Sequence, residues 1–167
     1  MKIKLCTRNE IDKIMQIYDS ARNFMRENGN KNQWINGYPQ RELILKDISL
    51  NRFYGVYDNE NLIGVFMMLV GNDPTYEKIY QGSWLNDEKY VVIHRIATTL
   101  HGKGVAKACY DFALSKCNNL RIDTSSENTI MQRSLTKNGF KYCGIIYLEN
   151  GDPRLAYQKT IQINKKD

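Results

Sequence analysis

The chain has 167 residues, 42% of them hydrophobic and 25% charged, and its formal net charge is +6. Length and composition fit a single globular domain over residues 1–167 and exclude a mostly disordered chain. The positive charge suits an anionic ligand. It is not gathered on a basic and aromatic face, however, so nucleic acid is not an expected partner.

The sequence disfavours several other kinds of protein. The four cysteines form no C-x-x-C pair and no metal-ligand spacing, so no metal site is expected. Residues 1–4 lack the apolar run of a signal peptide, and no apolar stretch is long enough to span a membrane. A cytoplasmic protein without membrane contact is the simplest expectation.

The first part of the sequence predicts one strand and two helices. Residues 3–6 alternate in polarity, as a strand does, and the T-x-x-E pattern of residues 7–10 is typical of a capping box at a helix start. Apolar residues then recur at helical spacing over residues 11–25, and the Asn-Gly-Asn cluster at 28–30 ends that helix. After a polar loop, a short second helix is predicted over residues 40–48.

The middle of the sequence predicts three strands and the start of a third helix. Residues 53–57 and 62–70 are expected to form a hairpin, and its second strand is almost wholly apolar, as a central strand would be. Residues 71–88 are predicted to form a loop and residues 90–98 the next strand. A helix is expected to follow the glycines of residues 102–104.

The last part predicts a strand at residues 120–123, a helix over 128–138 and a hairpin formed by 140–148 and 153–161. Residues 162–167 are expected to fray. The central strand-helix-strand order indicates a parallel pair, to which the hairpins add antiparallel strands. The expected fold class is therefore a mixed α/β sheet.

The glycine loop between strand and helix is the most informative motif. Gly102 and Gly104 let backbone N–H groups approach an anion, and a helix N-terminus adds unpaired donors and a favourable dipole. A dinucleotide fingerprint is excluded because the third glycine is missing, and a P-loop because Lys103 is not followed by Ser or Thr. The loop is either a pyrophosphate site or a tight turn.

Two separated motifs resemble those of the GNAT superfamily of N-acetyltransferases. The segment HGKGVA at 101–106 is similar to the acetyl-CoA signature Q/R-x-x-G-x-G/A, with His101 in place of Gln or Arg. The segment N-x-x-M…G-F from 128 to 140 resembles the family's N-x-x-A…G-F pattern. The resemblance covers residues 1–160. It implies a mostly antiparallel sheet of six to seven strands with one splayed parallel pair, about four helices, and acetyl transfer to an amine.

The resemblance also implies how acetyl-CoA binds. The pantetheine arm is expected between strands 90–98 and 120–123, and the backbone of 101–106 is expected to hold the pyrophosphate. Lys103, Lys107 and Arg133 are candidates for the outer phosphates. The implied cofactor-binding residues are Ile96, Thr98, His101, Gly102, Lys103, Gly104, Val105, Ala106, Asn128, Met131 and Arg133.

Acetyl transfer needs a base for the amine and a donor for the oxyanion. His94 is the candidate base, because it is expected on the same strand face as Ile96 and an ordinary imidazole pKa of about 6.5 suits this role. The backbone N–H near Ile96 is the candidate oxyanion donor. A packed histidine is the alternative for His94. Asp123 is a second candidate base, with capping of the next helix as its alternative.

The general acid is not identified, because Leu135 occupies the slot of the family tyrosine. Ser134, Tyr142 and Tyr147 stay open, as does protonation by water or by the substrate. The loop residues Trp34, Tyr38 and Trp84 either line an acceptor pocket or cover the core.

The acceptor is expected to be a primary amine of a small molecule or a peptide. A protein N-terminal amine or lysine and a non-catalytic acyl-CoA-binding module remain the alternatives, and a homodimer is left open.

Overall fold

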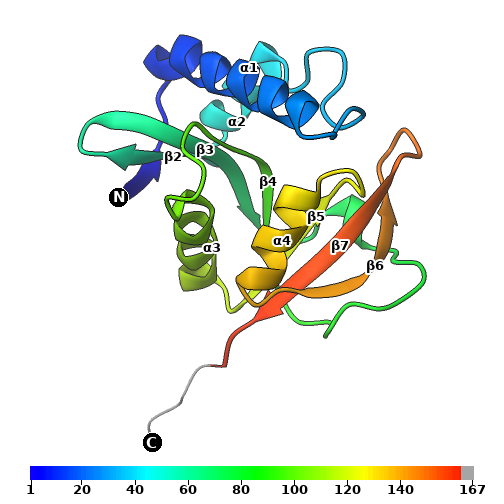
Figure 1. Cartoon of the computed structure of the whole chain (residues 1–167). Helices are drawn as coiled ribbons and strands as arrows, with labels where there is room; N and C mark the ends of the chain where they lie inside the picture. Colours follow the sequence, from blue (N-terminus) through cyan, green and yellow to red (C-terminus); the bar gives the residue numbers. More distant parts are fainter. Residues whose placement is uncertain (163–167) are drawn as a thin grey trace, which may run out of the picture.

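The computed structural model of the chain describes residues 1–162, so the expected fraying of residues 162–167 lies outside the described part except for Gln162. A seven-stranded sheet has the order β1-β2-β3-β4-β5-β7-β6, and helices cover both of its faces (Figure 1). The strands are β1 (Lys2–Leu5), β2 (Phe53–Asp58), β3 (Asn61–Val70), β4 (Val91–Thr98), β5 (Asn119–Thr124), β6 (Lys141–Tyr147) and β7 (Pro153–Thr160). The helices are α1 (Ile11–Glu27), α2 (Arg41–Ser49), α3 (Val105–Lys116) and α4 (Thr129–Lys137), with short 3-10 turns at Arg8–Glu10 and Pro74–Tyr76.

These elements are those that the sequence predicted, with small shifts at their ends. The capping pattern of residues 7–10 is present, since the backbone N–H of Thr7 donates to Glu10 Oε1 at 2.9 Å. It opens the 3-10 turn that precedes α1. Helix α1 then buries Ile14, Ile17 and Tyr18 on one side, which is the amphipathic stripe expected of a helix on a sheet.

The two faces of the sheet carry different helices. Helices α1 and α2 pack with Phe53, Val65 and Met67 on one face, and α3 and α4 pack with Ile93 and Leu120 on the other. Figure 1 shows α1 and α2 above β3 and α3 below it. No helix within residues 1–162 is long and apolar enough to cross a membrane.

The parallel pair in the middle of the sheet is splayed, as predicted. Strands β4 and β5 are in register only at Val91–Leu120 and Val92–Arg121. Beyond Val92, β4 continues along β3 to Thr98, while β5 continues along β7 to Thr124. A gap therefore opens between the carboxyl ends of the two strands.

A β-bulge in β4 corrects one prediction. His94 lies opposite Met67 and Ala97 lies opposite Val65, so β4 carries one residue more than β3 in this interval. Arg95 takes up the bulge with a φ of 55°. As a result Ile96 packs into the same core as Ile93, on the side of α3 and α4. The His94 ring instead lies 5.8 Å from the ring of Tyr76, so the expectation that His94 and Ile96 share a face is wrong.

Residues 71–88 cover the half of the sheet that α1 and α2 leave free. Tyr76 is 1% exposed and packs with Tyr90, Val92 and Ile146. The indole N–H of Trp84 donates to the carbonyl of Tyr76 at 2.9 Å. The loop therefore places Tyr76, and the residues just before it, beside the gap between β4 and β5.

Candidate active site

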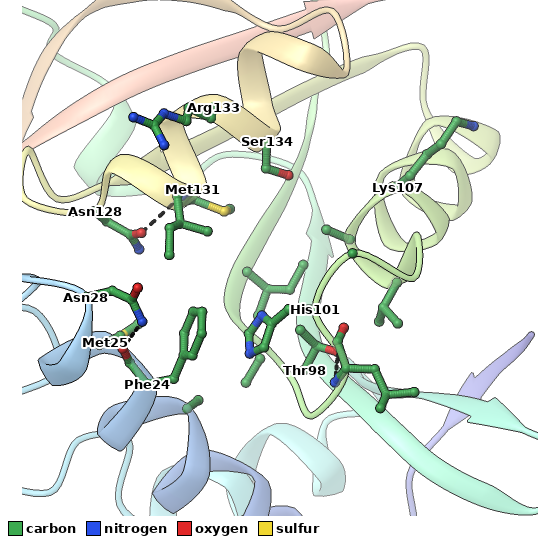
Figure 2. A pocket seen from close by; sticks show the side chains of 18 of the residues that line it. Phe24, Met25, Asn28, Thr98, His101, Lys107, Asn128, Met131, Arg133 and Ser134 are labelled. Atoms are coloured by element: carbon green, nitrogen blue, oxygen red, sulfur yellow. Dashed lines mark hydrogen bonds between the residues drawn. The ribbon is translucent and has the colours of Figure 1, made fainter.

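A cavity of about 450 Å³ lies where β4 and β5 separate. Its walls are the end of α1, the end of β4 with the glycine loop, and α4 with the residue before it. Figure 2 shows side chains from α1, the glycine loop and α4 around one space. The wall is largely apolar, with Phe24, Met25, Ile96, Val105 and Met131 among its residues. Such a space suits a ligand with an apolar or amide-bearing arm.

Most of the predicted cofactor residues line this cavity. They are Ile96, Thr98, His101, Gly102, Gly104, Val105, Ala106, Asn128, Met131 and Arg133. Lys103 is exposed and is not among the lining residues. Lys107 lines the cavity, and its ammonium pairs with Asp111 at 2.6 Å on the surface of α3.

The glycine loop presents backbone donors to the cavity. Gly102 and Gly104 have φ angles of 71° and 78°, a left-handed conformation that glycine adopts without strain. Gly104 is the N-cap of α3, and no side chain of the described residues caps it. The first amides of α3 are therefore available to a ligand, and the helix dipole favours an anion there.

His101 forms a wall of the cavity together with α1. Its ring stacks on Phe24 with 3.7 Å between ring centroids and 11° between ring planes. Figure 2 shows the two rings facing each other below Asn128 and Met131. The loop before His101 is fixed by Thr98, whose hydroxyl accepts from the backbone N–H of Leu100 at 3.1 Å.

Asn128 connects the cavity wall to the loop after α1. Its Oδ1 caps α4 by accepting from the backbone N–H of Met131 at 3.0 Å. Its Nδ2 donates to Gln33 Oε1 at 3.1 Å, and the same oxygen accepts from Asn30 Nδ2 at 2.8 Å. Because Asn128 caps α4, the alternative that Asp123 caps this helix is wrong.

The sequence did not single out the contribution of α1 to this wall. Phe24 and Met25 lie on its last turn, Asn28 follows directly as the C-cap, and all three line the cavity. The sequence does hold one sign of it. Phe24 and Met25 are adjacent, so they point in different directions, and a helix that buries a single apolar stripe does not need both.

His94 does not line the cavity but flanks the same gap from the other face. The last register pair of β4 and β5 is Val92–Arg121, and His94 and Asp123 stand two residues further along each strand. His94 Nε2 lies 2.6 Å from Asp73 Oδ2, and His94 Nδ1 lies 3.9 Å from Asp123 Oδ2. Tyr76 donates its hydroxyl to Asp123 Oδ2 at 2.6 Å.

Asp73 is held as an ionised carboxylate. Burial on its own raises the pKa of Asp73, but the hydrogen bond and charge of His94, and two hydrogen bonds from Thr75, outweigh burial and lower it to about 2. Thr75 contributes its backbone N–H at 3.0 Å and its hydroxyl at 2.7 Å, both to Asp73 Oδ1. An ionised carboxylate only accepts, so His94 Nε2 carries a proton and donates to Asp73 Oδ2.

The candidates for the general acid lie in different surroundings. Leu135 is fully buried among core residues, so the slot of the family tyrosine does not face the cavity. Ser134 does line the cavity, and its hydroxyl lies 3.3 Å from that of the buried Tyr110. Tyr142 and Tyr147 are exposed on β6 and are not among the residues that line the cavity.

The three aromatic residues proposed for the acceptor pocket do not line the cavity, and each contacts other side chains of the fold. Trp34 contacts the ring of Tyr18 edge-on at 5.5 Å. The hydroxyl of Tyr38 accepts from Arg95 Nη1 at 3.3 Å. Trp84 lies over the Arg121 guanidinium at 4.3 Å and against Tyr76 at 5.3 Å. Of the three, Trp84 has the most direct link to the polar cluster at the gap.

A comparison with solved structures identifies similar proteins. An acetyltransferase of the GNAT family from Streptococcus agalactiae 2603 is 33% identical to this chain. The TM-score is 0.88, and the match covers 97% of this chain and 96% of that one. The chain belongs to the GNAT family of acetyltransferases.

More distant structures share the GNAT fold. A putative acetyltransferase from Staphylococcus aureus MU50 is 21% identical, with a TM-score of 0.70. The match covers 97% of this chain and 100% of that one. A chain of the NatC complex bound to Gag peptide and CoA is 17% identical, with a TM-score of 0.58 over 97% and 100%. No family model and no curated protein matches the sequence. The predicted fold and enzyme class, an N-acetyltransferase, are confirmed, and acetyl transfer is the general activity of the GNAT family.

Proposed function

We propose that this GNAT member transfers the acetyl group of acetyl-CoA to a primary amine of a small molecule or peptide, by direct attack of the amine in a ternary complex. The observation that carries the proposal is the cavity that joins the glycine loop to the gap between β4 and β5. It has a site for an anion at one end and a strand edge without a partner strand at the other. This combination suits a long ligand with a pyrophosphate and an extended amide-bearing arm.

The residues of the cavity fit coenzyme A in chemical type. The amides of 102–106 would hold the pyrophosphate, and the backbone of Ile96 and Thr98 would pair with the amides of the arm. Asn128 and Met131 would form the opposite wall, and Arg133 would reach the phosphates. A more distant structure with this fold, the NatC complex, is described as bound to CoA, which supports the proposal. When bound, acetyl-CoA supplies a thioester carbonyl carbon that an amine can attack.

His94 is proposed as the general base and the backbone N–H of Ile96 as the oxyanion donor. With Nε2–H donating to Asp73, Nδ1 is the ring nitrogen left to take the proton of the amine. The bulge at Arg95 puts the side chains of His94 and Ile96 on opposite faces of the sheet. The imidazole would then act from one face of the gap while the cavity holds the donor on the other.

Binding of acyl-CoA without turnover is the competing function. The His94–Asp73 pair favours turnover, since holding a nucleotide does not need an oriented imidazole on the face away from the cavity. The first test is isothermal calorimetry with acetyl-CoA, with NAD and ATP as controls. The second is thiol release from acetyl-CoA with a panel of primary amines, peptides with free N-termini and lysine peptides.

The two histidines of the chain offer a crossed control. His94→Ala is expected to lower turnover about 10²-fold and to leave the Kd for acetyl-CoA unchanged. His101→Ala is expected to weaken acetyl-CoA binding, since its ring lines the cavity, and to leave turnover at saturation unchanged. A loss of turnover below threefold for His94→Ala would remove this residue from the role of base. Acetyl-CoA binding without thiol release for any amine would favour the binding module.

A further inference from the structure

We infer that the acceptor reaches the gap as an alkylammonium ion and that its nitrogen sits between His94 Nδ1 and Asp123 Oδ2, so that Asp123 selects cationic primary amines. The inference rests on the proposed acetyl transfer and adds an acceptor class and a specificity-determining residue to it. Neither Asp73 nor Asp123 lines the cavity proposed for the donor.

The distance between the two atoms carries the inference. His94 Nδ1 and Asp123 Oδ2 are 3.9 Å apart, which is too long for a direct hydrogen bond. One nitrogen atom placed between them can lie at about 2.8 Å from both, which is ordinary hydrogen-bond distance. A primary ammonium has three N–H groups, so it can donate to both atoms at once and still carry its alkyl chain outward.

The imidazole is oriented to receive one of these protons. Its Nε2–H is committed to Asp73, whose other oxygen is fixed by the backbone and hydroxyl of Thr75. Nδ1 is therefore the ring nitrogen that is not engaged by Asp73, and it lies toward Asp123. The His94 side chain keeps 24% of its surface exposed, so a small ligand can reach it.

Within the described residues, the Asp123 carboxylate is fixed in place and has no lysine or arginine partner. Tyr76 donates to Oδ2, and the Tyr76 ring is 1% exposed and held by Trp84. The nearby guanidinium of Arg121 lies between the rings of Trp84 and Tyr90, at 4.3 and 4.1 Å, and donates to the carbonyl of Asn86.

In the described part of the chain, no lysine or arginine nitrogen lies within the 4.0 Å ion-pair limit of Asp73 or Asp123. Their side chains are only 12% and 11% exposed. Among the described residues these two largely buried carboxylates have one basic neighbour, His94, so a further cation between them is favoured.

The proton balance of the reaction follows from this placement. The alkylammonium gives one proton to His94 Nδ1 and becomes a neutral amine, still hydrogen-bonded to Asp123. The amine lone pair forms the C–N bond at the thioester carbon, and the C–S bond breaks with its electron pair leaving on sulfur. The second N–H proton neutralises the thiolate, and His94 releases its proton to solvent. Alkylammonium and acetyl-CoA thus give the N-alkylacetamide, CoA thiol and one proton.

The test uses small probes on the full chain, without acetyl-CoA. Methylammonium is titrated while the side-chain nitrogen resonances of His94 are followed by long-range ¹H–¹⁵N NMR. Methanol serves as the neutral control, and tetramethylammonium as a cation without N–H. Methylammonium alone is expected to shift the Nδ1 resonance in a saturable way. An equal response to methanol or tetramethylammonium, or no response to methylammonium, overturns the inference.

Substitution then assigns the effect to Asp123. Asp123→Asn keeps the size of the side chain and an oxygen for the Tyr76 hydroxyl, so the fold is retained, which thermal unfolding checks. It is expected to weaken methylammonium binding at least tenfold, whereas Asp58→Asn, at the exposed end of β2, changes it less than twofold. In turnover, Asp123→Asn is expected to raise KM for alkylamines at least tenfold and to leave KM for aniline, which is neutral at pH 7.5, within twofold. Equal changes for both amines, or none, contradict the role of Asp123.

The two levels of the proposal fail in different ways. If acetyl-CoA does not bind, or no amine releases thiol, the proposed acetyl transfer fails whatever the NMR result. If amines are acetylated but Asp123→Asn keeps the wild-type preference for cationic amines, acetyl transfer stands and the inference is wrong.

Discussion

Gly104 offers a sharp test of the anion site, because the fold supplies a matched control in Gly151. Both residues are exposed with positive φ angles, 78° and 90°, and at each a built Cβ has no heavy atom within 4 Å. Gly104 is the N-cap of α3 beside the cavity, and Gly151 lies in the turn between β6 and β7. A side chain at either position therefore has the same backbone strain and the same open space, but only one of them meets the ligand.

The expected magnitudes separate stability from binding. Glutamate in the left-handed region costs about 1–2 kcal/mol at either position, which lowers Tm by roughly 2–8 °C in a chain of this size. At Gly104 the carboxylate would also approach the bound pyrophosphate, and a separation of about 5 Å serves for the Coulomb estimate. At an effective dielectric constant of about 20 this repulsion is about 3 kcal/mol per charge pair, which weakens binding by roughly 10²-fold or more.

Thermal unfolding and calorimetry with acetyl-CoA on both variants provide the assay. Gly104→Glu and Gly151→Glu should unfold at similar temperatures, while only Gly104→Glu loses acetyl-CoA affinity. Equal affinities for the two variants would refute the assignment of the glycine loop as the pyrophosphate site. The loop would then be a strand-to-helix turn and nothing more.

Three further expectations concern the surrounding framework. The pKa of Asp73 is lowered from 3.8 to about 2, so its carboxylate stabilises the fold by about 2 kcal/mol above pH 4, and this is lost as pH falls toward 2. Denaturant titrations of Asp73→Asn should therefore show a deficit at pH 6 that shrinks below pH 4 and falls to about a third by pH 2.5, and a deficit that does not depend on pH contradicts this. Leu135→Tyr, which restores the family tyrosine at a fully buried site, should lower the free energy of unfolding by about 1–3 kcal/mol without raising kcat. Asp47→Asn should cost about 3–5 kcal/mol, because it leaves the guanidinium of Arg95 unpaired, whereas Asp12→Asn, an exposed ion-pair partner, should cost less than about 1 kcal/mol.

The elements of the fold could be predicted because their signals are local. Helix α1 shows a stripe of apolar residues at helical spacing, and the Asn150-Gly151 pair marks the last hairpin. The glycine loop could likewise be predicted as an anion site, since the argument needs only a strand, two glycines and a helix start. The residues 101–106 then meet the cavity as expected, except for Lys103.

The rest of the site depends on tertiary structure that local patterns do not encode. The bulge at Arg95 reverses the face of Ile96 relative to His94, and alternation along β4 gives no sign of an extra residue. Asp73 and Tyr76 come from a loop without periodicity, yet they supply the partners of His94 and Asp123. The stack of Phe24 on His101 likewise joins two segments that are far apart in the sequence.

The narrow seam between β4 and β5 also has a consequence for cooperativity. Every strand pairing on either side of it is antiparallel, within β1–β4 and within β5–β7–β6, and only two register pairs join the blocks. Native-state hydrogen exchange should therefore resolve two cooperative units, β1–β4 and β5–β7–β6. Separation of β4 from β5 should cost less free energy than unfolding of either unit. A ligand lying along the unpaired edge of β4 would span both units, so their amides should then exchange as one.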